Sequence, residues 1–201
     1  MPSADPAGVG NRPTGEPEHL HRFRPTGEET VHRGWFISVV RATFVDPGGV
    51  PFERDIVRHP GAVAVVAVTD DDAVVLARQF RPAINQWILE IPAGTCDVEG
   101  EPSEVTARRE LAEEVGYAAG ELNLLTRCVI TPGFCDEFAT IYLATGLSPV
   151  PLDRQGTEEH YMSVEEIPLS RFDDLVDSGA IIDASTILGV ALARRRLASG
   201  R

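Results

Sequence analysis

The alternation of apolar and polar residues predicts strands along most of the first half of the chain. Residues 62–68 form an almost continuous apolar run after Gly61, which is typical of a strand buried on both faces. Two β-branched and aromatic stretches, 35–45 and 50–58, flank the turn signal Asp46-Pro47-Gly48-Gly49 and predict a hairpin. The remaining expected strands cover 73–80, 87–91, 122–130, 138–144 and 160–164.

Apolar residues at a different spacing predict the helices. Ala107, Leu111 and Val115 recur every four residues between Pro102 and Gly116, which predicts a helix with one buried stripe. A short helix over 170–178 and an amphipathic C-terminal helix over 184–197 are also expected, with a long polar connection over 147–157. Many strands with about three helices predict an α+β fold, an α/β/α sandwich around a mixed sheet.

The N-terminal region has a different composition. Residues 1–30 are rich in Pro, Gly, Glu and His, so we expect a mobile tail there. An N-terminal β-strand element over 31–60 and a main domain over 61–201 should follow, since the total length suits one compact domain.

The charge balance excludes some partners. Thirty-one acidic residues against 18 basic ones give a formal net charge of −13, which would repel DNA or RNA. A small anionic substrate stays possible, because a local arginine cluster or a metal ion can outweigh the overall field. There is no signal-peptide pattern, no apolar run of about 18 residues and no disulfide pattern among three cysteines. We therefore expect no membrane association and a cytoplasmic location.

Three glutamates on the predicted helix suggest chemistry. Glu110 and Glu114 are four positions apart, so their carboxylates project from one helical face, and Glu113 lies beside them. Like charges at this spacing repel by a few tenths of a kcal/mol, which a divalent cation would relieve. Arg109 can hold the carboxylates through a bidentate pair. An ordinary solvated acidic face is the alternative reading of the helix alone.

The stretch from Gly94 to Tyr117 resembles the Nudix box, whose consensus is Gly, five residues, Glu, seven residues, then Arg-Glu-apolar-any-Glu-Glu-any-Gly-apolar. Every position from Glu101 to Tyr117 matches, and the one departure is six residues instead of five between Gly94 and Glu101. The extra residue lies in the loop, so we expect the carboxylate geometry of the helix to be kept.

This resemblance implies a hydrolase that cuts a nucleoside diphosphate linked to another moiety. It implies Mg²⁺, or Mn²⁺, bound by Glu110 and Glu114, with Glu113 sharing the site and the backbone carbonyl of Ala93 as a further ligand. The metal would neutralise the diphosphate and orient water.

Features outside the box resemble the ADP-ribose pyrophosphatase branch of the family. Pro132 lies fifteen positions past Tyr117, within a loop over 131–137 that is similar to the Ser-Pro-Gly-Phe-Ser-Asp-Glu loop of that branch, with Cys135 in place of Ser. The strand over 87–94 also resembles the one that leads into the box there. The resemblance implies that Pro132, Gly133 and Glu137 contact the substrate.

Other substrate contacts are expected from arginines and one aromatic residue. Arg78 and Arg81 lie in an Arg-Gln-Phe-Arg strand similar to the family's, and arginine forks suit phosphate. Arg54 and Arg58 resemble another family element near the ribose and phosphates. Trp35 or Phe36 on the first strand could stack on adenine. The alternatives are exposed strand arginines and a tryptophan packed in the hairpin.

The general base is expected from the loop before the last strand, where Glu158 and Glu159 form the acidic pair from which this branch takes its catalytic carboxylate. The resemblance also implies a homodimer with exchanged N-terminal strands. The predicted reaction is Mg²⁺-dependent hydrolysis of ADP-ribose to AMP and ribose 5-phosphate. ADP-glucose, GDP-mannose or another nucleoside diphosphate sugar is an alternative substrate, and a non-catalytic ADP-ribose sensor is a less favoured alternative.

Overall fold

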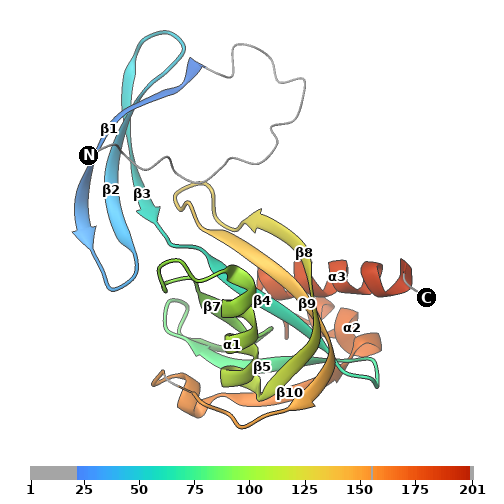
Figure 1. The fold of residues 1–201 in the computed structure, drawn as a ribbon. Coiled ribbons are helices and arrows are strands. Elements are labelled where there is room, and N and C mark those ends of the chain that lie inside the picture. Colours follow the sequence, from blue (N-terminus) through green and yellow to red (C-terminus); the bar gives the residue numbers. More distant parts are fainter. Residues whose placement is uncertain (1–21, 155, 200–201) are drawn as a thin grey trace.

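The fold contains two β-sheets, one small and N-terminal and one large that is covered by helices (Figure 1). A computed structural model describes residues 22–154 and 156–199. The small sheet extends away from the large one, and its last strand leads directly into the centre of the large sheet. The α+β class expected from the sequence is confirmed.

The small sheet is antiparallel in the order β1 (Arg24–Arg33), β2 (Ser38–Val45) and β3 (Pro51–Arg58). The expected tail over 1–30 is therefore wrong for residues 24–30, while residues 1–21 lie outside the described residues. Every residue of β1 is exposed, so no apolar alternation marks it in the sequence. Backbone pairing with β2 holds this strand in place instead.

The expected strand over 35–45 begins too early. Trp35 lies in the turn between β1 and β2 and not on a strand. The backbone N–H of Gly34 donates to the carbonyl of Ile37 at 2.9 Å, which closes this turn. The hairpin needs these residues to reverse the chain, so β2 begins only at Ser38.

The large sheet is mixed, with the order β10-β5-β4-β9-β8 and two short additions, β6 on β5 and β7 on β4. Only the β4–β9 pair is parallel among the described pairs, because the chain leaves β4 and returns to it through several intervening elements. The strands are β4 (Ala62–Val68), β5 (Ala73–Arg81), β6 (Gln86–Glu90), β7 (Ala93–Thr95), β8 (Tyr117–Val129), β9 (Phe138–Pro149) and β10 (Ser163–Pro168).

Helices cover both faces of this sheet, giving the expected three layers (Figure 1). Alternate residues of β4 point to opposite faces: Val63 and Val65 pack with Leu111 of α1 (Ser103–Val115), whereas Val66 packs with Val190 of α3 (Ala184–Ser199). The short α2 (Phe172–Asp177) joins the α3 side through Phe172. The two apolar layers explain why the β4 sequence is apolar at every position.

Several boundaries in the second half differ from those expected. Strand β9 continues to Pro149, into the predicted connection over 147–157, because pairing with β8 extends as far as Tyr117. The expected strand over 160–164 is instead the 3₁₀ turn η2 (Glu159–Tyr161) followed by β10, and a second turn, η3 (Leu169–Arg171), precedes α2. No helix in the described ranges is long and apolar enough to cross a membrane.

Candidate functional site

Helix α1 is anchored so that its glutamates lie at the glycine loop before it. The apolar stripe Ala107, Leu111 and Val115 is buried against the sheet. The helix ends at Gly116, whose φ of 74° is a left-handed conformation that glycine adopts without strain. Before the helix, Glu101 accepts a hydrogen bond from the Thr106 hydroxyl at 2.7 Å, which ties the loop to the first turns.

Arg109 links the acidic side chains of the site. Its Nη1 group donates to Oε1 of Glu110 at 2.8 Å and to Oε2 of Glu113 at 3.1 Å, and Nη2 lies 3.5 Å from Glu101. One guanidinium thus offsets the repulsion among three carboxylates that the helix and loop bring together. The arginine thereby holds these side chains in a fixed arrangement.

Glu114 is the most buried carboxylate on the helix, at 4% exposure. Its Oε2 accepts a hydrogen bond from the backbone N–H of Ala93 at 2.9 Å. Burial raises the pKa of Glu114 to about 8, and the nearby charges of Glu110 and Glu159 add to this, while Arg81 and the Ala93 hydrogen bond oppose it. Such a carboxyl is costly to keep charged unless a cation is supplied.

Gly94 leaves room for Glu110. A Cβ at position 94 would lie 2.1 Å from Cδ of Glu110, so any larger residue would displace this carboxylate. Burial also raises the pKa of Glu110, with Glu113 and Glu159 adding to the effect and Arg109 opposing it. The glycine at the start of the box is therefore required by the close approach of loop and helix.

The donor set fits a hard divalent cation. Carboxylates and a backbone carbonyl are the ligands that Mg²⁺ takes, and the glycine cradle lets loop and helix donors approach each other. Among the described residues, no three His, Cys, Asp or Glu side chains form a finished metal-binding cluster. Glu110 accepts a hydrogen bond from Arg109 through Oε1, and Glu114 accepts one from the Ala93 amide through Oε2, so each carboxylate keeps a second oxygen that can ligate a cation.

A cavity of about 410 Å³ lies beside the box. Ala93 and Gly94 form part of its wall, Arg81 enters from the end of β5, and Glu137 enters from the loop before β9. The cavity thus brings together three parts of the chain that are far apart in sequence: the box, Arg81 and Glu137. Phe36, His59, Asp183 and Ser185 also line it.

The sequence analysis missed two acidic residues, one that lines this cavity and one that binds an arginine of its wall. Glu90, which is 5% exposed, binds the Arg81 guanidinium, and Asp183, which precedes α3, lines the cavity. Burial opposes the charge of Arg81, but the hydrogen bonds and charge of Glu90 more than offset it and raise the pKa of this guanidinium. The sequence could have indicated Glu90, because it is the one acidic residue in the otherwise apolar strand over 87–91 and a buried carboxylate needs a partner.

Four other candidates line a second cavity, of about 520 Å³, between the small sheet and the 131–137 loop. They are Arg54, Arg58, Pro132 and Gly133, among several phenylalanines. Arg58 is engaged by Asp136, with a contact of 2.9 Å, and by Glu28, and both raise its pKa against the opposing effect of burial.

Neither Arg78 nor Trp35 lines either of these two cavities. Arg78 donates from Nε to Oε1 of Glu165 on β10 at 2.7 Å. Trp35 is 99% exposed, so it is not packed in the hairpin core, which was the alternative to a substrate contact. The neighbouring Phe36 is the aromatic residue of this turn that reaches the 410 Å³ cavity, where it packs edge-on against His59.

The two loop glutamates differ in position. Glu159 begins η2 and is half-buried, whereas Glu158 is exposed. The charge of Glu159 raises the pKa of both Glu110 and Glu114, which places it near the box helix. A Cβ at Gly156 would meet Oε1 of Glu159 at 2.8 Å, so the loop is shaped around this side chain.

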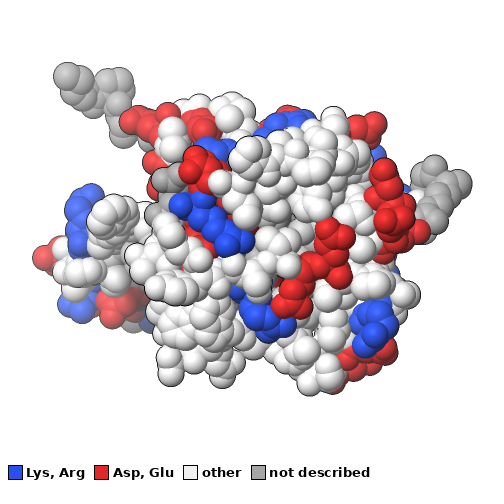
Figure 2. Space-filling model, turned by 90° about the horizontal axis from the view of Figure 1, so that it is seen from below, with Lys and Arg blue, Asp and Glu red and all other residues white. Residues whose placement is uncertain are grey.

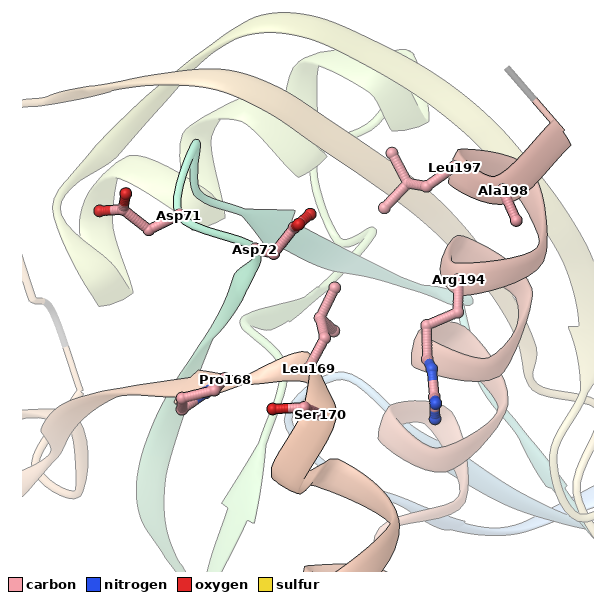
Figure 3. A pocket seen from close by; sticks show the side chains of 8 residues that line it. All are labelled: Asp71, Asp72, Pro168, Leu169, Ser170, Arg194, Leu197 and Ala198. Atoms are coloured by element: carbon pink, nitrogen blue, oxygen red, sulfur yellow. The ribbon is translucent and has the colours of Figure 1, made fainter. Parts of the chain in front are cut away.

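A larger cavity, of about 710 Å³, lies elsewhere, between the β4–β5 turn, the start of η3 and the end of α3 (Figure 3). None of the candidate residues lines it. Leu169 and Leu197 border the space, while Arg194 is paired with Asp173. It lacks the carboxylates and arginines that converge at the box, so size alone does not mark the site. On the face seen in Figure 2, acidic and basic side chains form separate clusters among uncharged residues.

Comparison with known proteins identifies relatives of this chain. The NUDIX domain model matches residues 58–182. An ADP-ribose pyrophosphatase of Bacillus subtilis is 42% identical over 163 residues, covering 81% of this chain and 88% of that protein. An ADP-ribose pyrophosphatase of Mycobacterium tuberculosis is 38% identical, covering 85% and 82%. The crystal structure of an ADP compounds hydrolase superposes with a TM-score of 0.78 at 26% identity, covering 89% and 96%.

Proposed function

Because this chain belongs to the Nudix hydrolase family, a membership that its match over residues 58–182 establishes, we propose that it hydrolyses the diphosphate of ADP-ribose to AMP and ribose 5-phosphate. The observation that carries the proposal is the meeting of the box with Arg81 and Glu137 at one cavity. The similarity to two ADP-ribose pyrophosphatases over most of the chain supports this choice of substrate.

We infer that Glu110 and Glu114 hold Mg²⁺, or Mn²⁺, together with Glu113 and the carbonyl of Ala93. A bound cation would neutralise charge on the diphosphate and increase the electrophilicity of phosphorus. Arg109 holds the carboxylates of Glu110 and Glu113 close together. The raised pKa of Glu114 means that its carboxyl gains most from a neighbouring positive charge.

We assign substrate binding to residues of both cavities. Arg81 donates to oxygens of the diphosphate in the box cavity, since its guanidinium lines that space. Glu137 lines the same wall. Arg54, Pro132 and Gly133 border the aromatic cavity beside it, which offers apolar surface for a nucleobase. Arg58 joins the two regions through Asp136, the neighbour of Glu137.

We propose Glu159 as the general base. Its half-buried position and its electrostatic effect on the box glutamates favour it over the exposed Glu158. Glu159→Gln should lower kcat by about 10²–10⁴-fold, the usual contribution of a general base, while Glu158→Gln serves as the matched control and should stay near wild type. Equal losses in both variants would contradict the assignment.

We further infer a homodimer formed through the N-terminal sheet. This sheet extends from the body (Figure 1), and its first turn exposes Trp35 almost completely. Exposed aromatic residues on a projecting element are costly for an isolated chain and suit a partner copy, where Trp35 would approach a substrate bound by the other protomer.

Arg78, which is paired with Glu165, is a further candidate substrate contact, and its substitution would test that role.

The test is a hydrolysis panel with purified protein and Mg²⁺. ADP-ribose is compared with ADP-glucose, GDP-mannose, NADH and a nucleoside triphosphate, and the products are separated by chromatography. We expect AMP to form fastest from ADP-ribose and to vanish in Glu114→Gln or after removal of the metal with EDTA. Faster cleavage of another sugar nucleotide would change the substrate, and binding of ADP-ribose without any cleavage would refute the hydrolase proposal.

A further inference from the structure

Glu90 is an unusual residue in this fold. Among the described residues only two charged side chains are buried, Glu90 and Glu114. A buried carboxylate is unfavourable unless a cation or several hydrogen-bond donors compensate it. Glu114 belongs to the box, whereas Glu90 lies at the end of β6 and is not among the residues that line the adjacent cavity.

The partner of Glu90 is Arg81, which does line that cavity. The Nε group of Arg81 lies 2.9 Å from both carboxylate oxygens of Glu90, and Nη2 also contacts Oε2. A guanidinium has five N–H donors, and this pair occupies those on one edge. Within the described residues, no partner takes the Nη1 hydrogens.

The backbone next to Glu90 is held by residues at the start of α3. The N–H of Ile91 donates to the hydroxyl of Thr186 at 2.9 Å, and that hydroxyl donates to Oδ2 of Asp183 at 2.7 Å. Thr186 is fully buried at the start of α3. The end of β6 is thus tied to a helix terminus, which restricts movement of Glu90 and, through it, of Arg81.

We propose that Glu90 is a positioning residue that holds Arg81 with its Nη1 edge free to donate to the diphosphate oxygens of the substrate. The inference rests on the proposed function and adds a residue outside the box and outside the cavity wall. Preorganised arginine donors bind an anion without the entropy cost of fixing a long side chain on binding.

The test uses Glu90→Gln in the full chain with ADP-ribose and Mg²⁺. Glutamine keeps the size of the side chain but removes the charge and one acceptor, so the guanidinium loses its fixed orientation. We expect KM to rise about tenfold, equivalent to about 1.4 kcal/mol, with kcat within about threefold of wild type. Asp173→Asn, which breaks the Arg194 ion pair away from the site, is the control and should leave KM unchanged.

A double-mutant cycle separates positioning from a general structural effect. If Glu90 acts through Arg81, then Glu90→Gln should raise KM no further in an Arg81→Gln background. An unchanged KM in Glu90→Gln, or an equal rise in both backgrounds, would overturn the inference. Should Glu90→Gln not fold, Glu90→Asp retains the charge, cannot span both contacts and is expected to raise KM in the same direction.

Affinity for ADP, measured by calorimetry with Mg²⁺, distinguishes failure of this inference from failure of the proposed function. If wild type cleaves no sugar nucleotide but binds ADP more tightly than Glu90→Gln does, the proposed function fails and the positioning role stands. If wild type and Glu90→Gln bind ADP equally, or neither binds it, the positioning role is wrong.

Discussion

Replacing Glu114 with glutamine should stabilise the metal-free protein while abolishing its activity. The wild-type carboxyl has a pKa of about 8 in the folded chain against an ordinary 4.5, chiefly because it is buried. At pH 7 the folded protein therefore holds a proton that the unfolded chain releases. Taking up this proton on folding lowers the free energy of unfolding at pH 7. Glutamine is neutral in both states and can still accept the Ala93 hydrogen bond.

The magnitude follows from the two pKa values. Stability of the wild type should fall as the pH rises from 4.5 to about 8, by about 1.4 kcal/mol for each pH unit, and then become constant. At pH 7 the accumulated cost is about 3 kcal/mol, a large part of the roughly 5–15 kcal/mol that stabilises a typical domain. Near pH 4.5 the variant and the wild type should be almost equally stable.

Urea unfolding in EDTA, monitored by circular dichroism at about pH 5, 7 and 8.5, measures this difference. We expect the gap between Glu114→Gln and wild type to widen with pH, and to narrow when Mg²⁺ is added, because the cation binds only the folded wild type tightly. A variant no more stable than wild type at pH 7, or a gap that does not depend on pH, would refute the reasoning.

Three further substitutions probe other parts of the site and its support. Gly94→Ala should retain the fold but lose most Mg²⁺-dependent hydrolysis, because its Cβ would lie 2.1 Å from Cδ of Glu110; full activity would contradict the close approach. Gly116→Ala should cost about 1 kcal/mol or more in urea unfolding, since φ is 74° and the new Cβ would lie 3.2 Å from the carbonyl oxygen of Val150. Thr186→Val should lower the free energy of unfolding by about 1–3 kcal/mol, because the buried N–H of Ile91 loses its acceptor; an unchanged urea midpoint would disprove that role.

The local parts of the molecule could be predicted from sequence because their geometry depends on neighbouring residues. The shared face of Glu110 and Glu114 follows from helical spacing alone, and the pairing of Arg109 with Glu113, four positions on, follows from the same rule. The apolar run of β4 likewise indicated a strand between two covered faces, and the structure has one helix layer on each. These features need no knowledge of distant segments.

Other features depend on which distant segments meet, and their residues carry no local signal. Strand β1 is exposed along its whole length and exists through backbone pairing with β2, so its polar sequence reads as a tail. The proposed choice of Glu159 over Glu158 rests on the fold of their loop, in which Glu159 is half-buried and Glu158 is exposed. The hydrogen bond between the N–H of Ile91, next to Glu90, and the hydroxyl of Thr186 joins residues 95 positions apart.

The amino-acid sequence by itself therefore determined the family, the fold class and the set of carboxylates on α1, because short-range periodicity and motif spacing express them. Only the tertiary structure decided that Arg81 and Glu137 share a cavity with Gly94, that Arg54 and Pro132 line another, and that Glu90 holds Arg81. Strand register and helix docking set these distances, and both depend on the packing of residues far apart in the chain.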